Sequence, residues 1–135
     1  MTTTKVGSAA NGKIVIDATN ALTAEMQLAV GFTTSGAEEL QKSLPKAKVV
    51  KAFNTVFAQH MDSGKLNGQV LTAFASSDDE VARNKVLELL RAIGFDAVNA
   101  GPLANARHLE ALGYLNIQLG YVLGNSAMTG FKYVR

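Results

Sequence analysis

Two nearly continuous apolar runs in the first half of the chain predict buried strands. Residues 13–19 are rich in β-branched side chains and end immediately before Asn20. Residues 48–53 have the same character and end immediately before Asn54. Such continuous apolarity is typical of a strand that is covered on both faces, as in a parallel sheet.

The segment between these strands predicts a loop followed by a short helix. Residues 21–34 show no sustained period and are assigned to the loop. Ser35 and Glu38 match a capping box, in which the two side chains satisfy amides left open in the first helical turn. Apolar residues at helical spacing continue to Leu44, and Pro45 prevents a further turn. The order strand, helix, strand is the crossover unit of a parallel sheet.

The second half of the chain repeats this order. After a loop at 61–68 that is rich in Gly, Asn and Asp, residues 69–75 are predicted to form a third strand. A capping box at Ser77 and Glu80 then begins a helix that ends at Gly94. The predicted apolar face of this helix comprises Val81, Ala82, Val86, Leu89, Leu90 and Ile93.

Residues 95–100 predict a fourth strand, and a long helix is expected over residues 105–124. These elements indicate an α/β fold, a partial Rossmann-like (doubly wound) sheet of about four strands with flanking helices and a long C-terminal helix. Residues 1–12 are predicted to be a flexible N-terminal segment, and residues 13–135 a single domain. Small residues along one stripe of the long helix would let another backbone or a flat ligand approach: Gly113, Asn116, Gly120 and Gly124.

Composition narrows the possible functions. The 135 residues carry a formal charge of only +2, with Lys and Arg scattered among the acids. Neither nucleic acid nor a membrane surface is therefore an expected partner. The absence of cysteine excludes disulfides and cysteine nucleophiles. No secretory signal or apolar run of membrane-spanning length is recognisable, and a cytoplasmic location is expected.

Asn20 and Asn54 follow two neighbouring parallel strands, at the rim where ligands of such sheets bind. An asparagine amide can hold a carboxamide or a ribose hydroxyl, but it can equally cap the turn that follows a strand. Residues 33–36 begin a helix and are a candidate anion site. The alternative is that Ser35 simply caps this helix.

Ionisable side chains provide no obvious catalytic set. Asp17 lies within an apolar strand and Glu110 within an apolar helix, so either is a candidate buried acid. The alternative is that Asp17 lies at a strand end and Glu110 on a solvent-exposed helix face. His60 and His108 share no metal-ligand spacing with a carboxylate, and no G-x-S-x-G elbow occurs. We therefore predict no catalytic residue and no metal site.

Three blocks of sequence are more specific than these individual signals: Gly-Lys-Ile-Val-Ile-Asp-Ala-Thr-Asn at 12–20, Thr-Ser-Gly-Ala-Glu-Glu at 34–39, and Val-Val-Lys-Ala-Phe-Asn-Thr at 49–55. In this order and spacing they resemble the NADP oxidoreductase family typified by the coenzyme F420 (deazaflavin)-dependent NADP reductase. Similar blocks occur in the oxidoreductase domain of the six-transmembrane metalloreductases. The resemblance continues through 100–103 and 116–120.

The resemblance implies a site for NADP(H) and, as co-substrate, a deazaflavin or flavin. The nicotinamide-side rim of the family maps onto Thr19, Asn20, Phe53, Asn54 and Thr55. The acceptor-side wall maps onto Gly101, Pro102 and Leu103. Hydride transfer between two flat rings chiefly requires positioning and exclusion of water, so no general acid or base is needed.

The chain departs from the family pattern in two ways. Ala21 stands where such sequences often have proline, and no G-x-G-x-x-G turn follows a strand. The chain is thus expected to correspond to the C-terminal, substrate-side portion of the reductase without its glycine-rich Rossmann half, which makes NADP(H) binding weak or absent. The alternative function is a non-catalytic dimeric binding or assembly module that kept the fold.

A homodimer is the expected assembly. The strand at 13–19 would normally pair with the absent half, so it is left as an apolar sheet edge that is prone to pairing with another chain. Either this edge or the C-terminal helix at 105–124 is the predicted interface. A separately encoded Rossmann half is the alternative partner.

Overall fold

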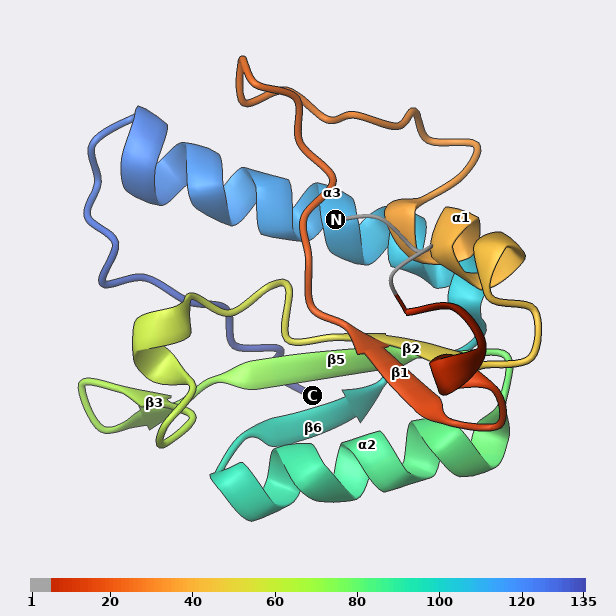
Figure 1. Ribbon diagram of the computed structural model, residues 1–135. Helices are drawn as coiled ribbons and strands as arrows, with labels where there is room; N and C mark the ends of the chain where they lie inside the picture. The colour runs from red at the N-terminus through yellow and green to blue at the C-terminus, as the bar shows by residue number, and fades with distance from the viewer. Residues whose placement is uncertain (1–5) are drawn as a thin grey trace.

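The structure is a computed structural model that describes residues 6–135, and it contains two strand–helix–strand units (Figure 1). In the first unit, β1 (Ile14–Asp17), α1 (Gly36–Ser43) and β2 (Lys48–Ala52) follow one another, and the two strands are parallel neighbours. The Ser35 side chain caps α1 by accepting a hydrogen bond from an amide of the first turn. The predicted crossover unit and its cap are confirmed.

The second unit consists of β5 (Thr72–Ser76), α2 (Glu80–Ile93) and β6 (Asp96–Asn99), and its strands are also parallel. The helix begins after Asp79, whose carboxylate accepts a hydrogen bond from a first-turn amide. The capping box predicted at Ser77 is therefore wrong. The Ser77 hydroxyl instead donates to a backbone carbonyl of β2, which ties the start of α2 to the sheet.

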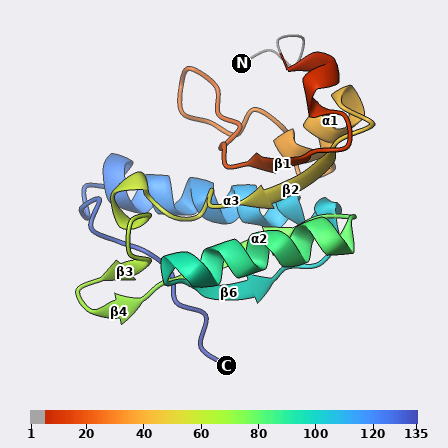
Figure 2. The ribbon, with the colours of Figure 1, turned by 60° about the horizontal axis from the view of Figure 1, so that its bottom comes forward.

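The two units join in a mixed sheet rather than a purely parallel one. The strand order is β1-β2-β5-β6, and β2 runs antiparallel to β5. The helix α2 covers one face of the sheet, and α1 and α3 (Ala106–Ile117) cover the other (Figure 2). A π turn at Gln118–Val122 extends α3, as expected for a long C-terminal helix. The partial Rossmann-like sheet of about four strands is confirmed, and the antiparallel junction between its two units is a feature that the sequence did not predict.

A small hairpin lies where the sequence predicted a loop and part of the third strand. The strands β3 (Lys65–Leu66) and β4 (Gln69–Val70) pair antiparallel around Asn67 and Gly68, which both have positive φ. An Asn-Gly pair is the strongest short-range signal for such a turn. The strand predicted over 69–75 is therefore divided, and only its second part joins the main sheet.

The main core lies between α2 and the sheet. Its buried side chains include Val86 and Leu90 from the predicted apolar face, and Leu87, which the prediction omitted. Val81 and Leu89 were predicted to belong to this face but are 62% and 44% exposed. The predicted apolar face of α2 included too many residues, because only one stripe of a surface helix faces the core.

Part of the predicted flexible N-terminal segment packs against the domain. Gly7–Ala10 form a 3-10 helix, and Ala10 is buried beside Leu44 and Ala47. Residues 1–5 of that segment lie outside the described residues. Among the helices that the structure describes, none combines the length and the apolar character of a membrane span.

Candidate functional site

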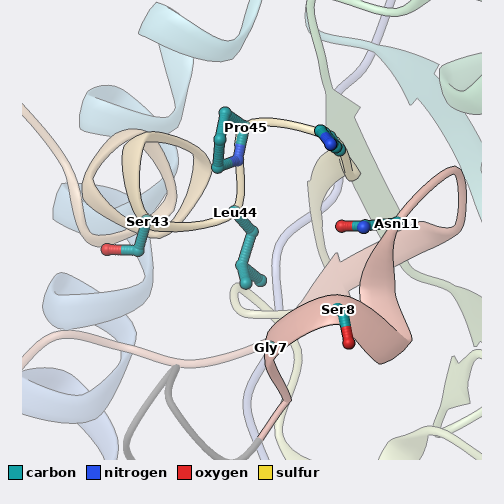
Figure 3. A pocket seen from close by; sticks show the side chains of 7 residues that line it. Gly7, Ser8, Asn11, Ser43, Leu44 and Pro45 are labelled. Carbon is teal, nitrogen blue, oxygen red and sulfur yellow. The ribbon is translucent and has the colours of Figure 1, made fainter.

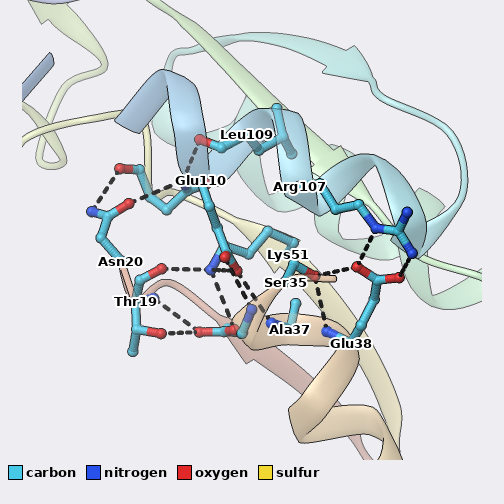
Figure 4. A network of polar contacts seen from close by, with 12 residues as sticks. Thr19, Asn20, Ser35, Ala37, Glu38, Lys51, Arg107, Leu109 and Glu110 are labelled. Carbon is cyan, nitrogen blue, oxygen red and sulfur yellow. Dashed lines mark hydrogen bonds and ion pairs between the residues drawn. The ribbon is translucent and has the colours of Figure 1, made fainter. Parts of the chain in front are cut away.

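A buried ion network lies at the carboxyl ends of β1 and β2, where ligands of such sheets bind. The parallel register places Asp17 directly opposite Lys51. The Lys51 ammonium lies 3.3 Å from the carboxylate of Asp17 and 3.0 Å from that of Glu110, and all three side chains are at most 4% exposed. Lys51 also donates a hydrogen bond to the carbonyl of Thr19 (Figure 4). The end of β1 is thus fixed to β2 and α3.

Glu110 also caps helix α1 from a different helix. Its two carboxylate oxygens accept hydrogen bonds from the amides of Gly36 and Ala37, at 3.0 and 3.2 Å. A carboxylate is stabilised at a helix N-terminus by the open amides and the helix dipole. At the candidate anion site of 33–36, the open amides of the helix start are therefore occupied by the protein's own carboxylate. Of the two alternatives left open for Asp17 and Glu110, the structure shows the buried one.

The first turn of α1 carries a second charged cluster. Glu38 accepts hydrogen bonds from the Arg107 guanidinium at 2.8 and 3.0 Å, and one from the Ser35 hydroxyl at 2.7 Å. The hydrogen bonds from Arg107 hold the pKa of Glu38 below its usual value, partial burial opposes this shift, and the bond from Ser35 adds to it. The Ser35 hydroxyl also accepts a hydrogen bond from the amide of Glu38, so the N-cap predicted at Ser35 is confirmed. The Glu38 carboxylate bonds to the Ser35 hydroxyl and to Arg107, so the second half of the predicted capping box is not formed.

Asn20 and Asn54 lie side by side where the two parallel strands end. The amide of Asn54 donates to Oδ1 of Asn20 and to the carbonyl of Leu109 in α3, and the amide of Asn20 donates to the carbonyl of Asn54. These bonds use both N–H groups of Asn54, which is 6% exposed. Within the hydrogen bonds of the described residues, the half-buried Asn20 uses only one of its two N–H groups. Asn54 therefore connects β2 to α3, and Asn20 retains a donor for another group.

Gly113 allows α3 to approach this asparagine pair closely. A Cβ atom at position 113 would lie 2.5 Å from Oδ1 of Asn20 and 2.9 Å from both the carbonyl oxygen and the amide nitrogen of Asn54. These separations are far shorter than van der Waals contact, so only a residue without Cβ fits here. At this position, the stripe of small residues along the helix serves close packing of the backbone.

Two other predicted rim residues are engaged with the protein itself. Thr19 is exposed, and its amide and hydroxyl both donate to the carboxylate of Asp17. Thr55 is buried, and its carbonyl accepts a hydrogen bond from the Asn116 amide in α3. Of these two threonines, only Thr19 is open to a ligand.

Phe53 has a left-handed backbone conformation, with φ of +69°. Its ring packs edge-on against Phe95, with a centroid separation of 6.3 Å, and joins the core beneath α2. A non-glycine residue in this conformation is strained and persists where the surrounding structure holds it. The structure therefore brings Thr19, Asn20 and Asn54 together at the rim and directs the Phe53 ring toward the core.

The residues predicted for the acceptor-side wall lie elsewhere, at the end of β6. The carbonyl of Gly101 accepts hydrogen bonds from the Ser77 amide and the Arg83 guanidinium, at 3.0 and 3.2 Å. Pro102 is exposed, whereas Leu103 is 2% exposed and packs beside α1 and β2. No hydrogen bond among the described residues joins this segment to the asparagine pair.

Two hollows on the described surface lie away from the ion network. One, of about 370 Å³, lies between the N-terminal 3-10 helix and the end of α1 (Figure 3). Another, of about 440 Å³, lies between the end of α1 and the start of α2. Neither is lined by a residue of the predicted rim or wall.

Sequence reasoning missed Lys51 and Arg107. Lys51 interrupts an apolar strand at the position that pairs with Asp17. Opposite charges at matching positions of two buried strands are a signal for a buried ion pair, because an unpaired charge would be too costly there. Arg107 gave no such signal, since its partner Glu38 lies 69 positions earlier in the chain.

One solved structure is similar to nearly the whole of this chain. A crystal structure from Arthrobacter sp. FB24, assigned as an F420-dependent NADP reductase, matches 98% of this chain with a TM-score of 0.86 and 33% sequence identity. The chain is similar to this reductase over nearly all of its own length. The family resemblance predicted from the sequence is thereby confirmed. The chain corresponds to 62% of the length of the Arthrobacter protein.

Further proteins are similar to part of this chain. The rat metalloreductase STEAP3 is 37% identical over 103 residues, and the human metalloreductase STEAP2 is 32% identical over 101 residues. Each match covers 75% of this chain but only 20% or 19% of the metalloreductase. A hypothetical protein from Sinorhizobium meliloti matches 70% of this chain and 47% of its own length, with a TM-score of 0.62 and 33% identity. No protein-family model matches the chain.

Proposed function

We propose that the chain supplies the substrate-side part of an NADP(H)-dependent oxidoreductase that transfers hydride between nicotinamide and a flavin-like acceptor. The observation that best supports this function is the rim at Asn20, which is held in place by Asn54 and Gly113. This rim lies in the sequence blocks that resemble the reductases. The Arthrobacter relative is described as acting with F420 and NADP.

The rim fits an uncharged polar substituent on a flat ring. Asn20 offers a remaining amide donor at a half-buried position, and Thr19 is exposed beside it. The charged groups beneath are buried and bonded within the protein, so none of them is free to pair with a charged ligand. Asn20 would hold the carboxamide of nicotinamide, a ring that supplies or takes up hydride when it is bound. The hydrogen bonds from Asn54 would keep the Asn20 amide in one orientation.

The described residues fit the nicotinamide end of the cofactor better than its phosphate end. The start of α1 offers the amides that a pyrophosphate would use, but Glu110 occupies them. Binding of NADP(H) to this chain alone is therefore proposed to be weak, with a dissociation constant of about 1–10 mM.

Titration with NADPH, followed by amide NMR shifts, tests this function. We expect the shifts to centre on Thr19 and Asn20, and Asn20→Ala to remove them. Asn84→Ala, on the exposed side of α2, is the matched control and should bind as the parent protein does. The absence of any shift up to about 10 mM NADPH would exclude a cofactor role for this chain.

A second candidate function is a non-catalytic binding or assembly module. Asn54 uses both its N–H groups within the protein, and Glu110 fills the helix start. Two groups that could contact a cofactor thus serve the fold instead. This candidate predicts no NADPH shift at Asn20 together with a stable oligomer.

We also propose that the chain associates through the edge of β1. This strand is at the edge of the described sheet, and Ile16 is 37% exposed. An apolar edge strand pairs readily with another chain, and a charged side chain on it opposes pairing. A homodimer is the proposed assembly, with the C-terminal helix as the alternative interface and a separate Rossmann half as the alternative partner.

Light scattering tests the proposed homodimer. The parent protein should have the mass of a dimer, and Ile16→Lys should shift it toward the monomer. A monomeric mass for the parent protein across micromolar concentrations would contradict the homodimer.

A cytoplasmic location and the absence of nucleic-acid and membrane partners stay predictions.

A further inference from the structure

A cavity of about 490 Å³ lies between the β5–β6 half of the sheet, one flank of α3 and the C-terminal segment. Its volume is within the range of small-molecule sites, roughly 300–1,000 Å³. Val98 and Ala100 line it from β6 and the turn that follows, and Leu109 and Leu112 line it from α3. These surfaces are aliphatic and favour contact with an apolar ligand.

A further wall of the cavity is aromatic and firmly attached. The rings of Phe74 and Tyr133 have centroids 6.3 Å apart and are inclined at 56°. The Tyr133 amide donates to the Thr72 hydroxyl at 2.8 Å, and Arg135 makes two hydrogen bonds to Asp96, at 2.7 and 3.1 Å. These bonds hold the C-terminal segment against the sheet. The Tyr133 ring is thereby available as a fixed surface for a second flat ring.

Three of the residues that line the cavity carry polar side chains: Asn99, Asn105 and His108. The Asn105 amide donates to the carbonyl of Ala100, and Oδ1 of Asn99 accepts the amide of Gly101, each at 2.8 Å, so both side chains are held by the backbone. His108 is exposed on α3. None of the described residues that line the cavity is acidic. A cationic ligand would therefore lack a charged partner, whereas an anionic group would meet N–H donors.

We propose that this cavity is a binding site for a planar aromatic anion, such as an aromatic carboxylate. The ring packs against the wall formed by Phe74 and Tyr133, and the anionic group lies beside His108. This site is separate from the rim at Asn20 and Asn54. The inference therefore does not depend on NADP(H) binding.

The probe that tests this site is 2-naphthoate, a flat bicyclic carboxylate. In an amide NMR titration of the full chain, the largest shifts are expected at residues 98–100 and 108–112. Cyclohexanecarboxylate keeps the charge without the flat ring, and 2-naphthalenemethanol keeps the ring without the charge. Each should bind roughly tenfold more weakly or worse. Equal binding of the three probes, or shifts spread evenly over the protein, would overturn the proposal.

Substitutions in two walls provide the second test. Tyr133→Ala should weaken 2-naphthoate binding roughly tenfold, whereas Tyr133→Phe should retain it. Tyr133 is 51% exposed, so neither change should unfold the protein. Leu112→Trp should fill the cavity and abolish binding, and Leu115→Trp is its control because Leu115 is 47% exposed on the same helix.

Two outcomes of these measurements would contradict the site. One is unchanged 2-naphthoate binding in both Tyr133→Ala and Leu112→Trp. The other is a shift of the same amides with protein concentration when no probe is present, because a second copy of the chain would then occupy the cavity.

Discussion

The ammonium group of Lys51 lies 3.0 Å from the carboxylate of Glu110, and both side chains are at most 2% exposed. Asp17 brings a second carboxylate to 3.3 Å from the same ammonium, so two buried acids share one buried base. Neutral donors balance the excess negative charge: two amides of α1 bind Glu110, and the amide and hydroxyl of Thr19 bind Asp17. Buried charges are tolerated only when they are fully partnered, so the network should respond strongly to the loss of a member.

Replacement of Lys51 by methionine should destabilise the protein severely. Methionine fills similar space but has no ammonium group, which leaves Asp17 and Glu110 as buried carboxylates without a cation. Removing one partner of a buried ion pair costs about 3–5 kcal/mol of unfolding free energy. Urea unfolding at neutral pH measures this loss.

The matched control for this change is Lys48→Met. Lys48 lies on the same strand, but its side chain is 47% exposed and its ammonium is 4.0 Å from Asp79. Exposed ion pairs contribute at most about 1 kcal/mol. Equal stability of Lys51→Met and Lys48→Met would show that the buried network does not hold the strand ends together.

Combining Lys51→Met with Glu110→Met should cost less than the sum of the two single changes. The second substitution removes one of the carboxylates that the first leaves without a cation. Residues in direct contact typically show coupling energies of about 0.5–3 kcal/mol in such a cycle. The four unfolding free energies, measured under one set of conditions, give the coupling. Strictly additive values would argue against a direct interaction between the two side chains.

The order of strands and helices was predictable because local sequence encodes it. The strand at 48–53 is mostly apolar and rich in β-branched residues, and the helix that ends at Gly94 has a periodic apolar face. The antiparallel junction of β2 and β5 was not predictable, since a strand buried on both faces has the same apolar pattern in either direction. The direction of β5 relative to β2 is decided by how the two strand–helix–strand units pack against each other.

The candidate site was predictable only in part. Asn20 and Asn54 stood out because each follows a buried strand, but Asn54 donates to the carbonyl of Leu109, which lies 55 positions later. Likewise, the cap that Glu110 provides for α1 comes from 73 positions away. Such partners are set by the packing of α3 on the sheet, and no local pattern in the sequence specifies them.

The ion pair of Glu38 and Arg107 should make stability depend on pH. The folded protein holds the pKa of Glu38 below its unfolded value, chiefly through the hydrogen bonds from Arg107. The pair therefore stabilises fully above the unfolded value of about 4.3, and this contribution is lost as the pH falls through the folded value. Glu38→Gln should cost about 1–2 kcal/mol at neutral pH, and its difference from the parent protein should shrink below about pH 4.3.

Chemical unfolding between neutral and acidic pH measures this difference. Glu88→Gln is the control, because Glu88 is exposed on α2. Its stability should follow that of the parent protein at every pH. If the penalty of Glu38→Gln stays constant into acid, the Arg107 pair is not the source of the shift.

Gly113→Ala should destabilise the protein even though alanine is the better helix former. In an isolated helix this change would be favourable by about 1 kcal/mol. Here the new Cβ would lie 2.5 Å from Oδ1 of Asn20 and 2.9 Å from the Asn54 carbonyl, so α3 must move or the asparagine pair must open. Overpacking of this kind costs about 1–3 kcal/mol.

Gly31→Ala is the control, since no atom lies within 4 Å of its Cβ position, and it should change stability by less than about 0.5 kcal/mol. Urea unfolding measures both variants, and a Gly113→Ala protein as stable as the parent would show that the close approach of α3 is not required.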